Sequence, residues 1–190
     1  MPSLVYPVIT SLDGYVVDAD GSFDWAEPDE EVHAFVNASE RTLGTHLLGR
    51  RLYETMKGWD TMPLDGATTV MRDFAELWRA ADKVVYSTTL DTVPTARTRL
   101  ESTFDPDAVR RAVDASDHDV SVAGPTLAAH AIRAGIVDVW HQFVCPVVVG
   151  GGTHWLPPGV RVDLDLVEER RFASGVVFLR YHTRRSGHPD

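Results

Sequence analysis

A glycine followed by two arginines marks the segment of this chain best suited to bind an anion. Residues 47–59 read Leu-Leu-Gly-Arg-Arg-Leu-Tyr-Glu-Thr-Met-Lys-Gly-Trp, so an apolar pair ends at Gly49 and a helix-compatible run follows. The first backbone N–H groups of a helix are unpaired and carry partial positive charge, which attracts phosphate. Gly49 lets a ligand approach the backbone, and Arg50 and Arg51 add planar donors for phosphate oxygens. An ordinary loop with solvated arginines is equally compatible with this segment alone.

Two further strand ends suit the same kind of ligand. They are Ser87-Thr88-Thr89 and Ala123-Gly124-Pro125-Thr126. Ser87 and Thr88 offer hydroxyl donors, whereas Gly124 and Thr126 offer backbone donors. Because loops at the carboxyl ends of parallel strands share one edge of a sheet, the three turns together predict an extended cofactor that carries phosphate. Neither the G-x-G-x-x-G loop nor a P-loop occurs in the chain.

Hydrophobic periodicity and turn residues indicate the elements that must position these turns. Strands are expected at 4–10, 45–48, 83–87, 118–123, 137–149, 162–173 and 176–181, with Pro146 as a candidate break. Helices are expected to open at 28–31 and to cover 50–57, 69–80, 106–113 and 126–134. This alternation predicts an α/β fold with a mostly parallel central sheet, helices on both faces and a C-terminal antiparallel hairpin. One domain is expected over 1–183, followed by a disordered tail over 184–190.

Composition limits the partners and the location of the protein. The 190 residues carry a formal net charge of −10, which argues against nucleic acid or an anionic membrane as a partner. No apolar run of about 18 residues and no secretory signal are present, so a cytoplasmic protein is expected. The single cysteine, Cys145, lies in an apolar run and is expected to be a buried thiol. The eight histidines lack zinc-type spacing, so no metal site is expected.

Short motifs in a fixed order along residues 5–181 identify a family. They are Ser11-Leu12-Asp13-Gly14-Tyr15, Phe23-Asp24-Trp25, Leu48-Gly49-Arg50-Arg51-Leu52-Tyr53-Glu54, Lys83-Val84-Val85-Tyr86-Ser87, Val122-Ala123-Gly124-Pro125-Thr126-Leu127, Ala134-Gly135-Ile136-Val137-Asp138, Pro146-Val147-Val148-Val149-Gly150-Gly151-Gly152 and Ser174-Gly175-Val176-Val177. With these motifs the chain resembles the dihydrofolate reductase superfamily. Within it, the chain is most similar to stand-alone proteins like the C-terminal reductase domain of the bifunctional riboflavin deaminase-reductase. The deaminase signature, H-x-E with P-C-x-x-C, is absent.

The resemblance implies an NADPH-dependent reductase, in a homodimer, that passes hydride to a small pteridine- or pyrimidine-like ring. It implies that the cofactor-binding residues are Gly49, Arg50, Arg51, Ser87, Thr88, Gly124, Pro125, Thr126 and Leu127. Of these, Ser87 and Thr88 would meet the adenosine 2′-phosphate and the others the pyrophosphate and ribose, while the 9–14 loop would cover the nicotinamide. Thr88 stands where the family often has a basic residue, so the preference for NADPH over NADH stays open.

A carboxylate that holds or protonates the ring is also implied. In folate-type enzymes it lies on the first helix after a tryptophan, and Glu30 follows Trp25 at similar spacing, with Asp13 on the covering loop as a second candidate. Acids at a helix start also complement the helix dipole, and Asp before Gly also forms turns, so both residues have a structural alternative. Trp25 and Met56 are expected to line the substrate site.

Three functions remain open from the sequence. They are reduction of 5-amino-6-(5-phosphoribosylamino)uracil or a similar ring, dihydrofolate reductase activity, and a sensor that binds NADPH without turnover. A phosphoribosyl substrate would require cations near the pocket, and the sequence does not tell whether Arg161 or Arg180 lies there.

Overall fold

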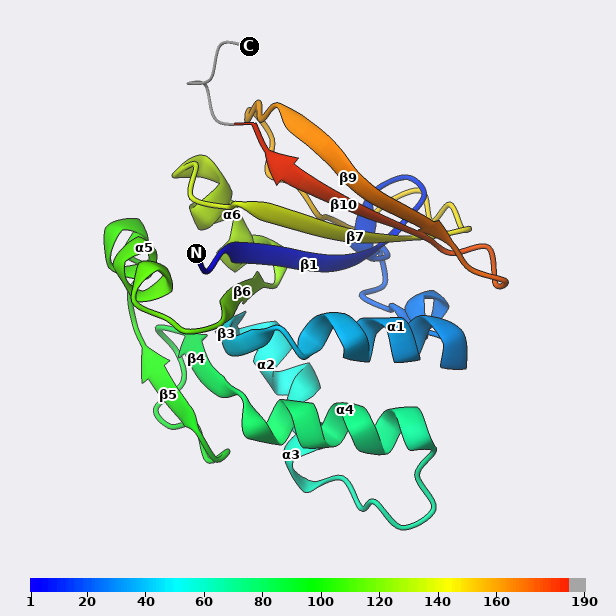
Figure 1. Cartoon of the computed structure of the whole chain (residues 1–190), viewed down its shortest axis with the longest axis horizontal. Helices are drawn as coiled ribbons and strands as arrows, with labels where there is room; N and C mark the ends of the chain where they lie inside the picture. The colour runs from blue at the N-terminus through cyan, green and yellow to red at the C-terminus, as the bar shows by residue number, and fades with distance from the viewer. Residues whose placement is uncertain (185–190) are drawn as a thin grey trace.

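The computed structural model describes residues 1–184, and its centre is an eight-stranded sheet in the order β5-β4-β3-β6-β1-β7-β10-β9 (Figure 1). The strands of this sheet are β1 (Leu4–Ser11), β3 (Leu43–Gly49), β4 (Asp82–Tyr86), β5 (Thr98–Glu101), β6 (Asp119–Ala123), β7 (Val139–Cys145), β9 (Leu164–Arg171) and β10 (Val177–Thr183). From β5 to β7 every neighbouring pair is parallel, and β10 is antiparallel to β7 and β9. The predicted mostly parallel sheet with an antiparallel C-terminal hairpin is confirmed.

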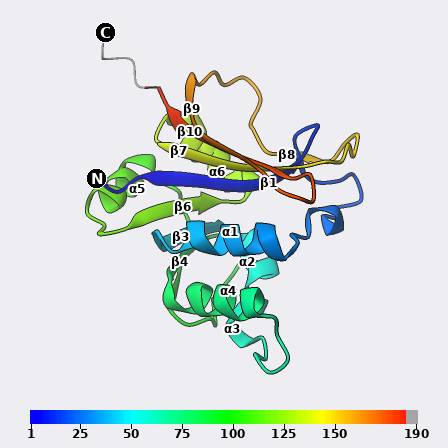
Figure 2. The same cartoon turned by 45° about the vertical axis from the view of Figure 1, so that its right-hand side comes forward.

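Helices cover both faces of the sheet, as predicted (Figure 2). They are η1 (Asp24–Ala26), α1 (Glu30–Glu40), α2 (Arg50–Met56), α3 (Gly58–Thr61), α4 (Thr69–Ala80), α5 (Pro106–Asp114) and α6 (Pro125–Arg133). Helices α5 and α6 pack on one face, and α1, α2 and α4 pack on the other. Among the described residues, no helix is both long and apolar enough to cross a membrane.

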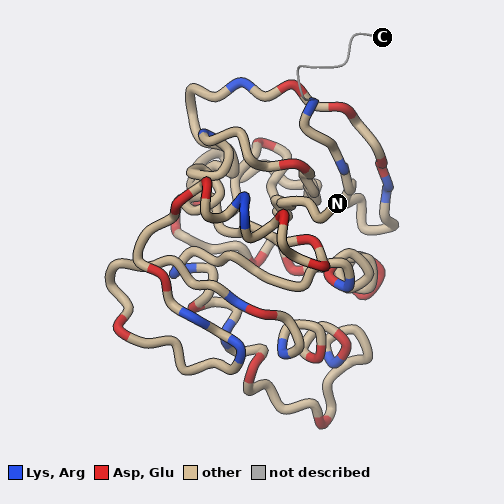
Figure 3. The backbone as a smooth tube through the Cα atoms, turned by 60° about the vertical axis from the view of Figure 1, so that its left-hand side comes forward, with Lys and Arg blue, Asp and Glu red and all other residues tan. Residues whose placement is uncertain are grey.

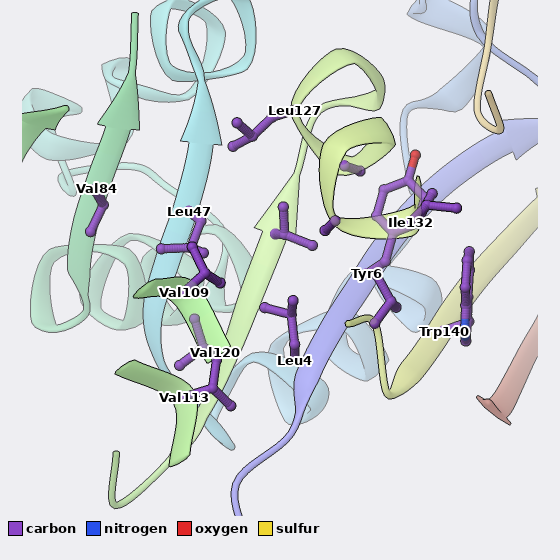
Figure 4. Close-up of a cluster of buried hydrophobic side chains, with 14 residues drawn as sticks. Leu4, Tyr6, Leu47, Val84, Val109, Val113, Val120, Leu127, Ile132 and Trp140 are labelled. Atoms are coloured by element: carbon purple, nitrogen blue, oxygen red, sulfur yellow. The ribbon is translucent and has the colours of Figure 1, made fainter. Parts of the chain in front are cut away.

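Alternating side chains of the central strands build the two apolar layers, because successive residues of a strand point to opposite faces. On β3, Leu47 packs towards α5 and α6, and Leu48 packs towards α2 and α4. Figure 4 shows the first layer, in which Leu4, Leu47 and Val84 of the strands meet side chains of α5 and α6. Strands buried on both faces are typical of a parallel sheet covered by helices.

Several element boundaries follow local chemistry. Helix α1 begins after Asp29, whose Oδ1 accepts a hydrogen bond from the Val32 amide at 2.8 Å, and α4 occupies the predicted 69–80. Strand β7 ends at Cys145, directly before Pro146, and is therefore shorter than the predicted 137–149.

Two parts of the fold differ from the sequence-based expectation. The sequence analysis did not predict β5, nor the two-stranded ribbon of β2 (Tyr15–Val17) and β8 (Thr153–His154). The disordered tail was predicted to begin at residue 184, but the Arg184 amide donates to the Asp163 carbonyl at 2.8 Å and its guanidinium binds Asp165. The start of the predicted tail is therefore wrong, and 185–190 lie outside the described residues.

Candidate functional site

The carboxyl ends of the six parallel strands lie along one edge of the sheet. Strands β1, β3, β4, β5, β6 and β7 end there, and the turns after β3, β4 and β6 bring the predicted cofactor residues to this edge. Strand β6 lies between β3 and β1, so the turn after β6 has the turn after β3 on one side and the end of β1 on the other. This is the edge at which ligands bind in open α/β sheets.

The glycine turns after β3 and β6 contact each other. A Cβ atom built on Gly124 would lie 3.8 Å from the Gly49 amide nitrogen, and one built on Gly49 would lie 3.6 Å from Leu127 Cβ. Gly124 has φ of 89°, a conformation that a side chain disfavours. Both glycines cap a helix, α2 and α6, without a side-chain hydrogen bond to the first amides. The amides at the two helix starts are therefore available to one anion.

Cationic side chains stand beside these turns. Arg50 and Arg51 open α2 and are exposed. Arg50 Nη1 lies 3.9 Å from Glu54 Oε1, a long ion pair between side chains that are both more than 40% exposed. Exposed pairs of this kind contribute little to stability, so Arg50 can exchange this partner for a bound phosphate at small cost.

Ser87 already has a structural role after β4. Its Oγ accepts hydrogen bonds from the Thr89 and Leu90 amides, both at 3.1 Å, and thereby holds the turn. Thr88 is exposed and forms no hydrogen bond among those the structure gives. The hydroxyl proton of Ser87 and the Thr88 side chain are the groups that this turn can offer to a ligand.

A pocket of about 210 Å³ opens at the same edge, between the ends of β1 and β7, the start of α1 and the β9–β10 turn. We name it the ring pocket; its walls include Ile9, Trp25, Asp29, Val32, Phe143 and Val176. The pocket is smaller than the roughly 300–1,000 Å³ of sites for drug-sized ligands, so it suits a ring whose substituents extend outside. In Figure 1 the loop from β1 to α1 lies at the right, beside the carboxyl ends of β1 and β7.

Trp25 and Met56, the two predicted substrate residues, occupy different places. Trp25 lines the ring pocket, and its buried indole Nε1 has no hydrogen-bond partner among the described residues. A buried donor without a partner costs free energy, which a bound acceptor would recover. Met56 instead packs beside Tyr53 and Phe74, between α2 and α4, and does not line the pocket. The prediction for Met56 therefore lacks support from the geometry.

The acids that line the ring pocket are Glu27 and Asp29, and the predicted Glu30 is not among the lining residues. Glu30 is the first residue of α1, is exposed and does not line the pocket. Asp29 lines it and uses Oδ1 to cap the helix at Val32. The sequence analysis considered Asp29 only as part of the helix start, and its capping position before Glu30 was the signal that could have separated the two.

Asp13 connects the loops that follow β1 and β7. Its carboxylate accepts hydrogen bonds from the Val149 amide at 3.2 Å and the Gly150 amide at 2.7 Å. A hydrogen bond with Ser11 lowers its pKa, and the Gly150 and Val149 amides act in the same direction. Asp13 is thus held as a carboxylate, which favours a positioning role over that of a proton donor.

The loops joined by Asp13 present apolar side chains to solvent. Leu12 and Val148 are each 66% exposed, and the Leu12 amide donates to the Val147 carbonyl at 2.7 Å. A Cβ atom on Gly152 would lie 2.0 Å from the Val17 carbonyl oxygen, so the end of the second loop requires glycine. Exposed apolar groups on two connected loops beside the ring pocket suit the face of a flat ring.

Three further features of the described residues bear on the site: the single cysteine, the distribution of basic side chains and the potential metal ligands. Cys145 lines the ring pocket as a buried thiol whose pKa is raised by burial, as expected for a core cysteine. In the view of Figure 3, Lys and Arg positions are scattered among Asp and Glu positions, and the described residues show no continuous basic stripe there. The described residues contain no group of three or more potential metal ligands.

Comparison with known proteins places this geometry in a family. The model of the RibD C-terminal domain matches residues 2–178, nearly the whole chain. The chain belongs to the RibD C-terminal domain family. It is 23% identical over 182 residues to the uncharacterized protein YyaP of Bacillus subtilis (strain 168), a match that covers 94% of each chain.

Solved structures of a riboflavin biosynthesis protein and of dihydrofolate reductase share the fold. A protein ascribed to riboflavin biosynthesis in Shewanella sp. PV-4 superposes with a TM-score of 0.76 at 17% identity, over 96% of this chain and 99% of the other. Dihydrofolate reductase of Enterococcus faecalis, complexed with NADP(H), superposes with a TM-score of 0.62 at 14% identity, over 96% and 97% of the two chains. The fold of this RibD-type domain is therefore dihydrofolate reductase-like, as the sequence predicted.

Proposed function

We propose that this protein is an NADPH-dependent reductase that passes hydride to a pteridine- or pyrimidine-like heterocycle, in the manner of 5-amino-6-(5-phosphoribosylamino)uracil reductase. The observation that carries this proposal is the common edge of the two sites. The ring pocket lies at the ends of β1 and β7, and the contacting glycine turns follow β3 and the strand next to β1, β6. Membership of the RibD C-terminal domain family supports the same reaction class.

The residues present fit a nicotinamide dinucleotide phosphate. Gly49, Arg50 and Arg51 would hold the pyrophosphate together with Gly124, Pro125, Thr126 and Leu127, because the two helix starts lie at one place; Pro125 has no N–H and would only shape the turn, whereas Thr126 and Leu127 offer amides. Ser87 and Thr88 would meet the 2′-phosphate with hydroxyl groups alone. When bound, the cofactor supplies the hydride, and the protein contributes binding and orientation.

Within the ring pocket, the protein's own groups would orient the substrate. Ile9, Phe143 and Val176 exclude water, the Trp25 indole N–H donates to a ring acceptor, and Asp29 accepts from a ring N–H. Asp13 keeps the two covering loops together, and Leu12 and Val148 add apolar surface on them. The cytoplasmic location expected from the composition and the homodimer implied by the family resemblance stay predictions.

Oxidation of NADPH against a panel of pterins, dihydrofolate and aminopyrimidines tests the proposed function. We expect a fall in absorbance at 340 nm with at least one ring, and NADH to be used within about two orders of magnitude of NADPH, since Thr88 carries no charge. Cofactor binding without oxidation by any ring would favour the sensor. A preference for dihydrofolate over aminopyrimidines would favour the dihydrofolate reductase alternative.

Replacement of the acids separates their roles. We expect Asp29→Asn to lower kcat/KM by about 10- to 100-fold, because the substitution replaces a charged hydrogen bond to the ring with a neutral one. The helix should stay intact, since Asn still caps α1. Glu30→Gln is expected to retain turnover, since Glu30 lies outside the pocket. Steady-state kinetics with thermal melts on both variants and on Asp13→Asn measures this. A loss of two to four orders of magnitude in Glu30→Gln or Asp13→Asn, with unchanged melting, would instead identify that residue as the general acid.

A further inference from the structure

The ring pocket has negative charge at its walls and no positive charge. Among the described residues that line it, Glu27 and Asp29 are acidic and none is Lys, Arg or His. The start of α1 contributes a partial positive charge, but the first turn already carries Glu30 and Glu31 beside the Asp29 cap. A substrate phosphate placed at the start of α1 would therefore lie near the three carboxylates of Asp29, Glu30 and Glu31, which offset the partial positive charge of the helix start.

Three arginines of the C-terminal part of the described chain, Arg161, Arg170 and Arg180, each have an acidic partner. Arg170 lies 3.1 Å from Glu31 and stacks on Phe35 and Phe172. Arg180 pairs with Glu168, and Arg161 pairs with Asp163 at 3.2 Å. None of the three lines the pocket. Arg161 and Arg180, the two arginines considered for a phosphoribosyl substrate, are therefore not part of the lining that a bound ring would contact.

The polar groups that remain suit an uncharged ring with both donors and acceptors. Trp25 Nε1 is a buried donor without a partner, and Asp29 keeps Oδ2 free of hydrogen bonds among the described residues while Oδ1 caps α1. A pyrimidine or pteridine with a carbonyl group and an amino substituent satisfies both. A phosphate group adds about −1.5 to −2 charges near pH 7, which Glu27 and Asp29 would repel.

We propose that the ring pocket takes an unphosphorylated, amino-substituted pyrimidine or pteridine, and that Glu27 and Asp29 discriminate against the phosphate ester of the same compound. This inference rests on the proposed function and narrows its substrate. The ring pocket would hold the ring of both compounds in the same way. Only the phosphate ester brings a further negative charge towards the carboxylates of Glu27 and Asp29, and this repulsion would weaken its binding.

Calorimetric titration of the full chain with 5-amino-6-(ribosylamino)uracil and with its 5′-phosphate tests the inference without turnover. At low ionic strength we expect the phosphate ester to bind at least about tenfold more weakly. In Glu27→Gln/Asp29→Asn the ratio of the two dissociation constants should fall towards one. Asp24→Asn is the matched control, because Asp24 is exposed in the same segment and does not line the pocket, so its ratio should stay as in the wild type.

Each possible result either supports or overturns the proposed selectivity of the ring pocket. Equal or tighter binding of the ester by the wild type, an unchanged ratio in the double variant, or an equal fall in Asp24→Asn overturns the inference. Failure of both compounds to bind also overturns it, even if NADPH oxidation with another ring upholds the proposed function. Conversely, tenfold discrimination in a protein that never oxidises NADPH would uphold the pocket's selectivity and reject the reductase.

Discussion

Replacing both Arg50 and Arg51 by alanine is expected to raise the dissociation constant of NADPH by at least two orders of magnitude. A charge-assisted hydrogen bond to phosphate contributes roughly 1.5–3 kcal/mol, and each 1.4 kcal/mol is a factor of ten in affinity. Both side chains are exposed at the start of α2, and the only ion pair of Arg50 among the described residues is 3.9 Å long. The substitution therefore removes the proposed ligand contacts without breaking a strong internal interaction.

Quenching of protein fluorescence by NADPH measures the effect, and a charge-matched variant controls for the lost net charge. Arg111→Ala/Arg133→Ala removes two exposed arginines from α5 and from the C-terminal end of α6, the end opposite to the Gly124 turn. We expect this control to bind NADPH about as tightly as the wild type in moderate salt. If the control weakens binding as much as Arg50→Ala/Arg51→Ala, the effect is one of net charge, and the proposed pyrophosphate site is wrong.

The sequence predicted the parts of the fold that depend on local patterns. Helix 69–80 was placed correctly because Val70, Phe74, Leu77 and Trp78 repeat at helical spacing, and Phe74 and Trp78 are buried as that spacing requires. Strand β5 was missed because its residues, Thr-Arg-Leu-Glu, alternate with only one large apolar side chain and follow Arg97, which has φ of 54°. Such a short edge strand is defined by its pairing with β4, which no local pattern encodes.

The candidate site likewise contains parts that the sequence predicted and parts that it did not. The glycine turns were predictable because strand, glycine and helix start adjoin in sequence at Gly49 and at Gly124. The sequence analysis chose Glu30 because it did not use the capping position of Asp29 to fix the helix start, and one residue along a helix turns a side chain by about 100°. The walls formed by Phe143 and Val176 come from segments more than 100 residues after α1, and only tertiary packing brings them there.

A buried polar cluster at the other end of the sheet has no role in the proposed site and makes stability depend on pH. Glu40 Oε2 lies 3.7 Å from His46 Nε2, and His46 Nδ1 forms a 2.8 Å hydrogen bond with Ser121 Oγ. Lys83 donates from Nζ to the Trp78 carbonyl at 2.8 Å, and the His46 ring stacks on Trp78. Burial lowers the pKa of His46 to about 4, with Lys83 acting in the same direction, and burial raises the pKa of Glu40 to about 7.

The two residues act on stability in opposite directions between pH 7 and pH 4.5. The stability contributed by His46 is complete above its unfolded pKa of 6.5 and is lost as the pH falls towards 4. The stability contributed by Glu40 is complete below its unfolded pKa of 4.5 and is lost as the pH rises through 7. In the wild type these contributions offset each other, which leaves His141, whose pKa burial also lowers to about 4, as a source of acid lability.

Glu40→Gln is therefore expected to make the protein more sensitive to acid. It removes the contribution that grows on acidification, so the free energy of unfolding should fall between pH 7.5 and pH 5 by about 2–3 kcal/mol more than in the wild type. Urea unfolding at both pH values measures this difference, and His141 contributes equally to both proteins. Glu76→Gln, an exposed acid on α4, should follow the wild type. Parallel pH dependences of Glu40→Gln and the wild type would mean that Glu40 is charged in the folded protein throughout this range, and that solvent or a cation stabilises it there.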